Sequence, residues 1–185
     1  MNTELSQKNV SRSYPTNIAF SLLEFVLLTG IGAIGVLIHA KFRLPLHIPG
    51  HWGIVFMTLL FSGRLFSQKK YASSLSSLGA AFMLLMPLGF KDPFMPVIYM
   101  LPGLFLDVFF NIFKSKNKHI VFVVLLSGLA YVTIPFIRII ITLVSGFFYG
   151  SFINGFMYPI IMHFLFGAAG GLIAWGAFTL IRKKF

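Results

Sequence analysis

The stretch LPLHIPGHWGIVFMTLLF, residues 44–61, decides how this chain folds because it joins a polar turn segment to an apolar helical segment. Its second half is an apolar run of the kind that enters a bilayer as a helix. Its first half places two imidazoles and an indole, those of His47, His51 and Trp52, around a Pro-Gly pair that favours a turn. The chain therefore turns at a membrane surface here and then enters the membrane.

The composition points the same way. The chain has 185 residues, of which 57% are hydrophobic and only 10% are charged. A soluble domain carries about 25% charged residues. The apolar residues also come in long blocks, which predicts an all-α integral membrane protein. No cysteine is present, which excludes disulfides and thiolate metal sites.

Six apolar blocks follow a polar N-terminal tail at residues 1–17, which lacks the basic-then-apolar order of a cleaved signal peptide. Each block is long enough to cross a bilayer, at roughly 17 to 26 residues. We therefore predict a single membrane domain over residues 18–185, a bundle of six transmembrane helices. The expected spans are Ile18–His39, Gly50–Phe66, Ala72–Phe90, Pro93–Phe113, His119–Val144 and Phe156–Ile181.

The basic residues set the orientation. With the N-terminus inside, eleven of the fifteen lysines and arginines fall on the inner side and three on the outer side, and Arg138 lies within the fifth span. This is a strong positive-inside bias, and it predicts that both termini are cytoplasmic. The net charge of +11 is then explained by basic loops that meet anionic lipid, so we do not expect a nucleic-acid partner.

Two spans carry small residues that allow close helix packing. Gly167 and Gly171 in the sixth span have GxxxG spacing, which favours packing within the chain. In the first span, Thr29, Gly32 and Ala33 lie on a small-residue face. This face either packs within the chain or docks a partner.

Ionisable residues inside the spans fall at two depths. From a rise of about 1.5 Å per residue, Arg138 and His163 lie about 10 Å below the outer surface. Glu24 and Asp107 lie at a similar depth from the inner surface, too far from Arg138 for an ion pair. We expect these two carboxylates to meet Arg64, a loop lysine or a partner chain, as structural or coupling charges.

We interpret the outer polar groups as a site for a small organic solute. An arginine supplies positive charge or a planar stacking surface, aromatic rings form walls, and imidazoles and amides donate or accept hydrogen bonds. The candidate solute-binding residues are His47, His51, Trp52, Arg138, Asn154, Tyr158 and His163.

Other roles for the histidines remain open. His47 and His51 have i, i+4 spacing, but a two-histidine metal site lacks the further ligands usually needed, so no metal or other cofactor is predicted. The same imidazoles also have a simpler role in ordering the loop. A bis-histidine haem between His39 and His163 is a minor variant.

Over nearly its whole length the chain resembles the substrate-binding subunits, or S-components, of energy-coupling-factor (ECF) transporters. The resemblance rests on size, six spans, termini on the inner side, the small-residue face of the first span and an outer loop entering the second. The stretch from Asp92-Pro93 through Tyr99 and Pro102-Gly103 to Asp107 is also similar to prokaryotic sequences of this group.

The resemblance implies an outward-facing pocket for a vitamin or related molecule in a prokaryotic plasma membrane. It also implies partners, namely a transmembrane coupling protein and two ATPase subunits. The family's coupling face often shows Ala-x-x-x-Ala, and Thr29-x-x-x-Ala33 stands at the nearest match here. The N-terminal Met-His of the metal-transporting relatives is absent.

Two other classes of function compete with solute uptake. An intramembrane enzyme needs paired carboxylates, a Ser-His arrangement or a metal cage, and the depths of His163 and Asp107 keep them apart. A membrane scaffold without a solute accounts equally well for the small-residue faces and basic loops. The sequence has no phosphate-binding GxxxxGK[ST] loop, so we expect no ATPase or other enzyme activity from this chain.

Overall fold

The computed structural model describes residues 18–42, 48–113 and 119–184. Within these ranges the chain is helical and contains no β-strand, which confirms the predicted all-α architecture. The elements in chain order are α1 (Ile18–Lys41), α2 (Gly53–Phe66), α3 (Ala72–Leu84), α4 (Met95–Ile112), α5 (Ile120–Ser145), the 3-10 turn η2 (Gly150–Phe152) and α6 (Met157–Lys184).

The surface of the bundle is that of a membrane protein. Helices α1, α4, α5 and α6 are long and apolar enough to cross a bilayer. Large apolar side chains face outward along them, and Leu143 and Val144 are 74% and 83% exposed. Burial of such side chains is strongly favoured in water, whereas hydrocarbon solvates them. The chain is therefore a membrane-embedded helical protein.

Helices α2 and α3 are shorter than the spans expected from the sequence. They measure about 20 Å each at 1.5 Å per residue, less than the hydrocarbon thickness of about 30 Å. Helix α2 begins three residues late because Gly50, at φ +81°, turns the chain before it. Helix α3 ends at Leu84, ahead of Pro87 and the positive-φ Gly89. Short helices are tolerated where protein covers their ends, and α2 packs in the interior of the bundle.

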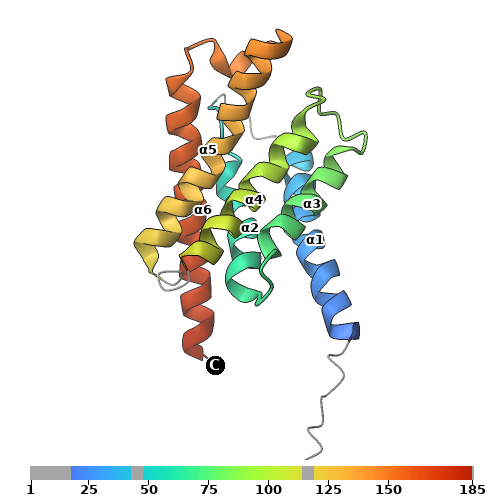
Figure 1. Cartoon of the computed structure of the whole chain (residues 1–185), viewed down its shortest axis with the longest axis vertical. Coiled ribbons are helices and arrows are strands. Elements are labelled where there is room, and N and C mark those ends of the chain that lie inside the picture. The colour runs from blue at the N-terminus through green and yellow to red at the C-terminus, as the bar shows by residue number, and fades with distance from the viewer. Residues whose placement is uncertain (1–17, 43–47, 114–118, 185) are drawn as a thin grey trace, which may run out of the picture.

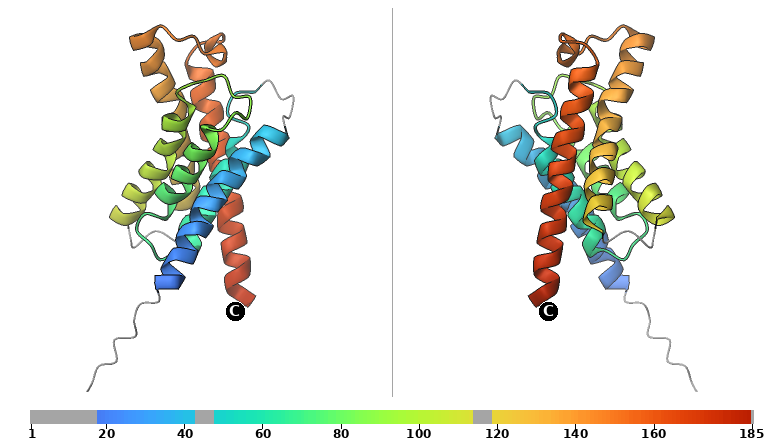
Figure 2. Two further views of the ribbon diagram at one scale, coloured as in Figure 1. Left: turned by 90° about the vertical axis from the view of Figure 1, so that its right-hand side faces the viewer. Right: turned by 90° about the vertical axis from the view of Figure 1, so that its left-hand side faces the viewer.

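The helices alternate in direction through the molecule (Figure 1). Helix α1 begins and α6 ends at the same end of the bundle, as six helices of alternating direction require (Figure 2). We call this the inner end, following the positive-inside count, and the opposite end the outer end. The most extensive packing joins α5 to α6, α1 to α3, α2 to α6 and α3 to α4.

Glycines in α6 allow it to approach α5 closely, as their GxxxG spacing predicted. A Cβ built on Gly167 would lie 2.6 Å from the Cβ of Tyr131, and one on Gly171 would lie 2.4 Å from the Cβ of Ser127. The Ser127 hydroxyl donates a hydrogen bond of 2.7 Å to the Gly167 carbonyl, a bond between helices in the membrane interior. These small residues serve packing within the chain.

The small-residue face of α1 is divided between the chain and the surface. Gly32 is buried against α3, where its Cβ would lie only 1.7 Å from the Ser76 carbonyl oxygen. It packs within the chain, so it is not part of an exposed docking face. Thr29 and Ala33 are partly exposed and line a shallow groove between α1 and α3.

Candidate functional site

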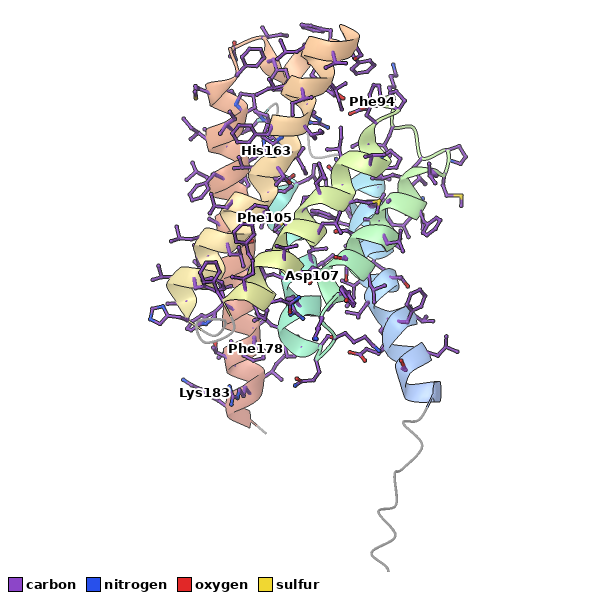
Figure 3. The ribbon with its side chains drawn as sticks, viewed as in Figure 1. Phe94, Phe105, Asp107, His163, Phe178 and Lys183 are labelled. Atoms are coloured by element: carbon purple, nitrogen blue, oxygen red, sulfur yellow. The ribbon has the colours of Figure 1, made fainter. Side chains whose placement is uncertain are left out.

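A polar cavity lies at the outer end of the bundle, beneath the segment that leads into α2. Its volume is ≈ 170 Å³. Figure 3 shows His163, one of its lining residues, at the level of the outer half of α6. Helices α1, α4, α5 and α6 all contribute to the lining. The residues with polar or aromatic side chains in it are His39, His51, Trp52, Tyr99, Tyr131, Arg138 and His163.

Two glycines of the entering segment make room for rings from distant helices. Gly50 lies against His163, and a Cβ there would stand 2.8 Å from the ring nitrogen Nδ1. Gly53 lies against Tyr131, and a Cβ there would stand 2.2 Å from the ring carbon Cε1. The His163 and Tyr131 rings are themselves stacked, with centroids 4.9 Å apart. The PGHWG sequence therefore positions the segment on a two-ring platform.

Backbone carbonyls fix the protonation pattern of two histidines. His51 Nδ1 lies 2.7 Å from the Ile48 carbonyl oxygen, and His163 Nδ1 lies 2.7 Å from the Pro159 carbonyl oxygen. A carbonyl oxygen only accepts, so each Nδ1 must carry the proton. In the neutral ring Nε2 is then an acceptor. The His51 Nε2 atom is buried and has no hydrogen-bond partner among the described residues.

Arg138 is paired inside the protein. Its Nη2 lies 3.5 Å from Oδ2 of Asp92, and both side chains are mostly buried. Its guanidinium also lies over the Tyr149 ring, 5.1 Å from the centroid. Asp92 therefore balances the positive charge that Arg138 was expected to offer a solute, and the planar guanidinium remains as a stacking surface. The arginine Nε is buried and has no hydrogen-bond partner among the described residues.

Asp92 joins three segments at the outer end. Its Oδ1 accepts a hydrogen bond of 3.0 Å from the Phe94 backbone amide at the start of α4. The Tyr149 hydroxyl donates a longer bond of 3.4 Å to the same oxygen. Burial raises the pKa of Tyr149 to about 12, and the Asp92 carboxylate also raises it. The hydroxyl consequently remains a donor at neutral pH.

Two tyrosines complete the cavity and were not among the predicted site residues. Tyr99 on α4 and Tyr131 on α5 are buried, and both line the cavity. Phe56 packs on the Tyr99 ring, with centroids 5.0 Å apart in an edge-to-face arrangement. The hydroxyl group of a tyrosine within an apolar span could have indicated these two site residues. Hydropathy, however, does not show which face of a helix the ring occupies.

The structure gathers four of the seven predicted solute-binding residues, namely His51, Trp52, Arg138 and His163. Asn154 is exposed in the loop before α6, and Tyr158 is half-buried in the first turn of α6. Neither lines the cavity. His47 lies outside the described residues.

The described residues offer no group of three histidine, cysteine, aspartate or glutamate side chains placed to hold a metal. The rings of His39 and His51 instead lie against Trp52, with centroids 4.5 and 5.7 Å from the indole. A metal held by His47 together with His51 is not tested, because His47 lies outside the described residues.

A second buried charge cluster lies toward the inner end, where Figure 3 places Asp107 well below His163. Arg64 Nε stands 3.4 Å from Asp107 Oδ1, and both side chains are buried. The Asp107 carboxylate also accepts hydrogen bonds from the backbone amides of Ser73 and Ser74, at 3.1 and 2.7 Å. Asp107 of α4 therefore caps the N-terminus of α3, where a negative charge is favourable.

The remaining intramembrane carboxylate also pairs toward the inner end. Glu24 lies 3.5 Å from the Lys69 ammonium, and it accepts a hydrogen bond of 2.5 Å from the Ser67 hydroxyl. Arg64 and a loop lysine are thus the partners of the two inner carboxylates, as the depth argument expected. The separation of Asp107 from His163 leaves no acid–base pair between them.

A larger hollow of ≈ 500 Å³ opens between α4 and α5, but its chemistry is uniform. Its lining is apolar except for Thr133, whose hydroxyl is bonded at 2.6 Å to the Ala130 carbonyl. Such a lining offers no directional contact to a polar solute. The outer cavity, although smaller, is where polar groups converge.

Comparisons of the chain with families of known proteins, with curated proteins and with solved structures give no match.

Proposed function

We propose that this chain is the solute-binding subunit of an ECF-type uptake transporter. In this role it captures a small organic solute, of the size class of a vitamin or smaller, at the outer face of a prokaryotic cell membrane. The outer cavity is the binding site. Trp52 and Tyr131 supply its walls, and His51, His163 and Arg138 supply hydrogen bonds.

The observation that carries this proposal is the convergence of polar groups in an otherwise apolar bundle. Burying an unpaired polar atom costs roughly 1–3 kcal/mol. Both His51 Nε2 and Arg138 Nε are in that condition, and both residues line the cavity. A solute that bonds to these atoms recovers that free energy.

Inward release then depends on other chains. Without a phosphate-binding loop in the sequence, ATP hydrolysis has to come from partner ATPases through a transmembrane coupling protein. Thr29 and Ala33, on the partly exposed groove between α1 and α3, are the candidate contacts for that protein.

The test is mass spectrometry of small molecules released from the gently solubilised protein, combined with binding measurements on variants. We expect one compound in stoichiometric amount. We also expect Trp52→Ala to lower its affinity at least tenfold while membrane insertion stays normal. Asn154→Ala is the matched control, because Asn154 was a candidate from sequence yet lies outside the cavity.

Two outcomes would count against the proposal. Unchanged affinity in Trp52→Ala would remove the cavity as the site. A protein that is reproducibly empty, and that binds no compound added back to it, would favour the scaffold function instead.

A further inference from the structure

The outer cavity also restricts the chemistry of its solute. Building on the proposed function, we infer that the solute is a neutral, flat, single-ring molecule with both N–H donors and carbonyl acceptors on its edge, the chemistry of a pyrimidine base. Size, charge, hydrogen bonding and ring walls each contribute to this inference.

The size of the cavity admits one ring. A volume of ≈ 170 Å³ is close to the dry cavity of about 150 Å³ that holds a benzene molecule in an engineered protein core. Sites for drug-sized ligands begin at about 300 Å³. A single ring fills most of a cavity of this volume, whereas a fused two-ring system would extend beyond it.

The charge balance of the cavity favours a neutral solute. Among the described residues that line the cavity, Arg138 is the one lysine or arginine, and its guanidinium pairs with Asp92 at 3.5 Å. Lys91, the neighbour of Asp92, is exposed and does not line the cavity. An anion would have to displace the Asp92 carboxylate or lie beside it, and a like charge at that distance is unfavourable.

The hydrogen-bonding groups of the cavity require donors and acceptors on the same solute. The Nε2 lone pair of His51 needs a donor, because Nδ1 is committed to the Ile48 carbonyl. The Nε2 atom of His163 is also a hydrogen-bond acceptor, because its Nδ1–H donates to the Pro159 carbonyl oxygen. The Nε–H of Arg138 needs an acceptor. A solute edge that carries both N–H and C=O groups offers partners of both kinds.

The walls favour a flat ring. Trp52 lines the cavity, and so do Tyr131 and His163, whose rings stack on each other. Aromatic rings bind one another best in offset-stacked or edge-to-face arrangements. A planar heterocycle gains from such walls, whereas a flexible chain or a sugar does not.

The experiment uses the full chain in detergent with Trp175→Phe, so that Trp52 is the only tryptophan. Trp175 lies about 18 Å along α6 from His163, so its replacement leaves the cavity intact. Quenching of Trp52 fluorescence and the shift in Tm are measured with four probes. These are uracil, orotate as its anionic relative, hypoxanthine as its two-ring relative, and 1,3-dimethyluracil, which has no N–H donor.

We expect uracil to quench Trp52 and raise Tm, and each of the other three probes to bind at least tenfold more weakly. A His51→Phe variant keeps a ring but loses the acceptor, so we expect it to lose at least tenfold in affinity for uracil. Its affinity for 1,3-dimethyluracil should stay unchanged, which separates a lost hydrogen bond from a damaged fold.

The outcomes distinguish this inference from the proposed function. Orotate or hypoxanthine binding as tightly as uracil, or release of an anionic or fused-ring compound from the purified protein, overturns the inference and leaves solute binding standing. Release of a different neutral single-ring compound supports the inference even if uracil neither quenches Trp52 fluorescence nor raises Tm. A protein that releases nothing and responds to no probe overturns both.

Discussion

At the scale of single residues, Gly50 combines a close contact with the His163 ring and a positive φ. Gly50→Ala places a methyl group 2.8 Å from the His163 Nδ1 atom in a backbone with φ +81°. We expect a loss of about 1–3 kcal/mol from overpacking, in addition to the strain of positive φ. We also expect weaker solute binding, because the displaced imidazole lines the cavity. Thermal unfolding and solute affinity are the measurements.

Gly155 provides a matched control for this substitution. Its φ of +83° is nearly the same, but nothing lies within 4 Å of a Cβ built there. Gly155→Ala therefore carries the backbone strain alone and should leave solute affinity unchanged. Equal loss of stability in the two variants would show that the contact with His163 contributes nothing.

Asp92 determines the charge of the outer cavity at the same scale. Asp92→Asn leaves the Arg138 guanidinium without its anionic partner, so the site becomes cationic. We expect a loss of about 1–3 kcal/mol in stability, as for a hydrogen bond to a charged group, together with stronger binding of an anion such as orotate relative to uracil. Lys91→Gln is the control, since that exposed neighbour has no part in the cavity. If the ratio of orotate affinity to uracil affinity does not rise in Asp92→Asn, the result contradicts the charge pairing of Asp92 with Arg138.

At the scale of elements, one carboxylate holds the start of α3 against α4. Asp107 accepts two backbone amides of α3 and pairs with Arg64 of α2. Asp107→Asn leaves the buried guanidinium unpaired, and removing one partner of a buried pair costs about 3–5 kcal/mol. We expect a large fall in Tm, measured by thermal unfolding, with solute binding retained below the transition because the cavity lies at the other end.

Glu24 offers the comparison that tests burial as the cause. Its pair with Lys69 has about the same separation, 3.5 against 3.4 Å, but its side chains are 32% and 35% exposed. Exposed ion pairs contribute about 0–1 kcal/mol, so Glu24→Gln should lower Tm little. A similar drop in both variants would mean that distance, and not burial, governs the cost.

At the scale of the whole molecule, the orientation in the membrane is open to direct measurement. The chain has no cysteine, so single cysteines report their own side. Met86 and Asn154 are exposed near the outer end, and Gln68 and Tyr71 are exposed near the inner end. Cysteines at the first two positions should react with an impermeant maleimide in intact cells. Cysteines at the other two should react only after permeabilisation. The reverse pattern would mean that the orientation is opposite to the predicted one.

The sequence alone was sufficient for the architecture. Hydropathy predicted every helix, because the cost of placing polar groups in hydrocarbon is a local property of the chain. It also placed Arg138 and His163 at a common depth, since a constant rise per residue converts position into height. Turns at Gly50 and Gly89 shorten α2 and α3 relative to the predicted spans, and the other four helices are long and apolar enough to cross a bilayer.

Which side chains meet was decided by the tertiary structure. Depth does not specify the rotation of a helix, so Tyr99 and Tyr131 were missed, and Asn154 and Tyr158 were placed in a site that they do not line. Nor does depth reveal that Asp92, from a loop, reaches Arg138 and cancels its charge. The sequence by itself determined which segments form apolar helices. The tertiary contacts of helices and loops decided the size, charge and hydrogen-bonding pattern of the cavity, because these depend largely on residues far apart in sequence.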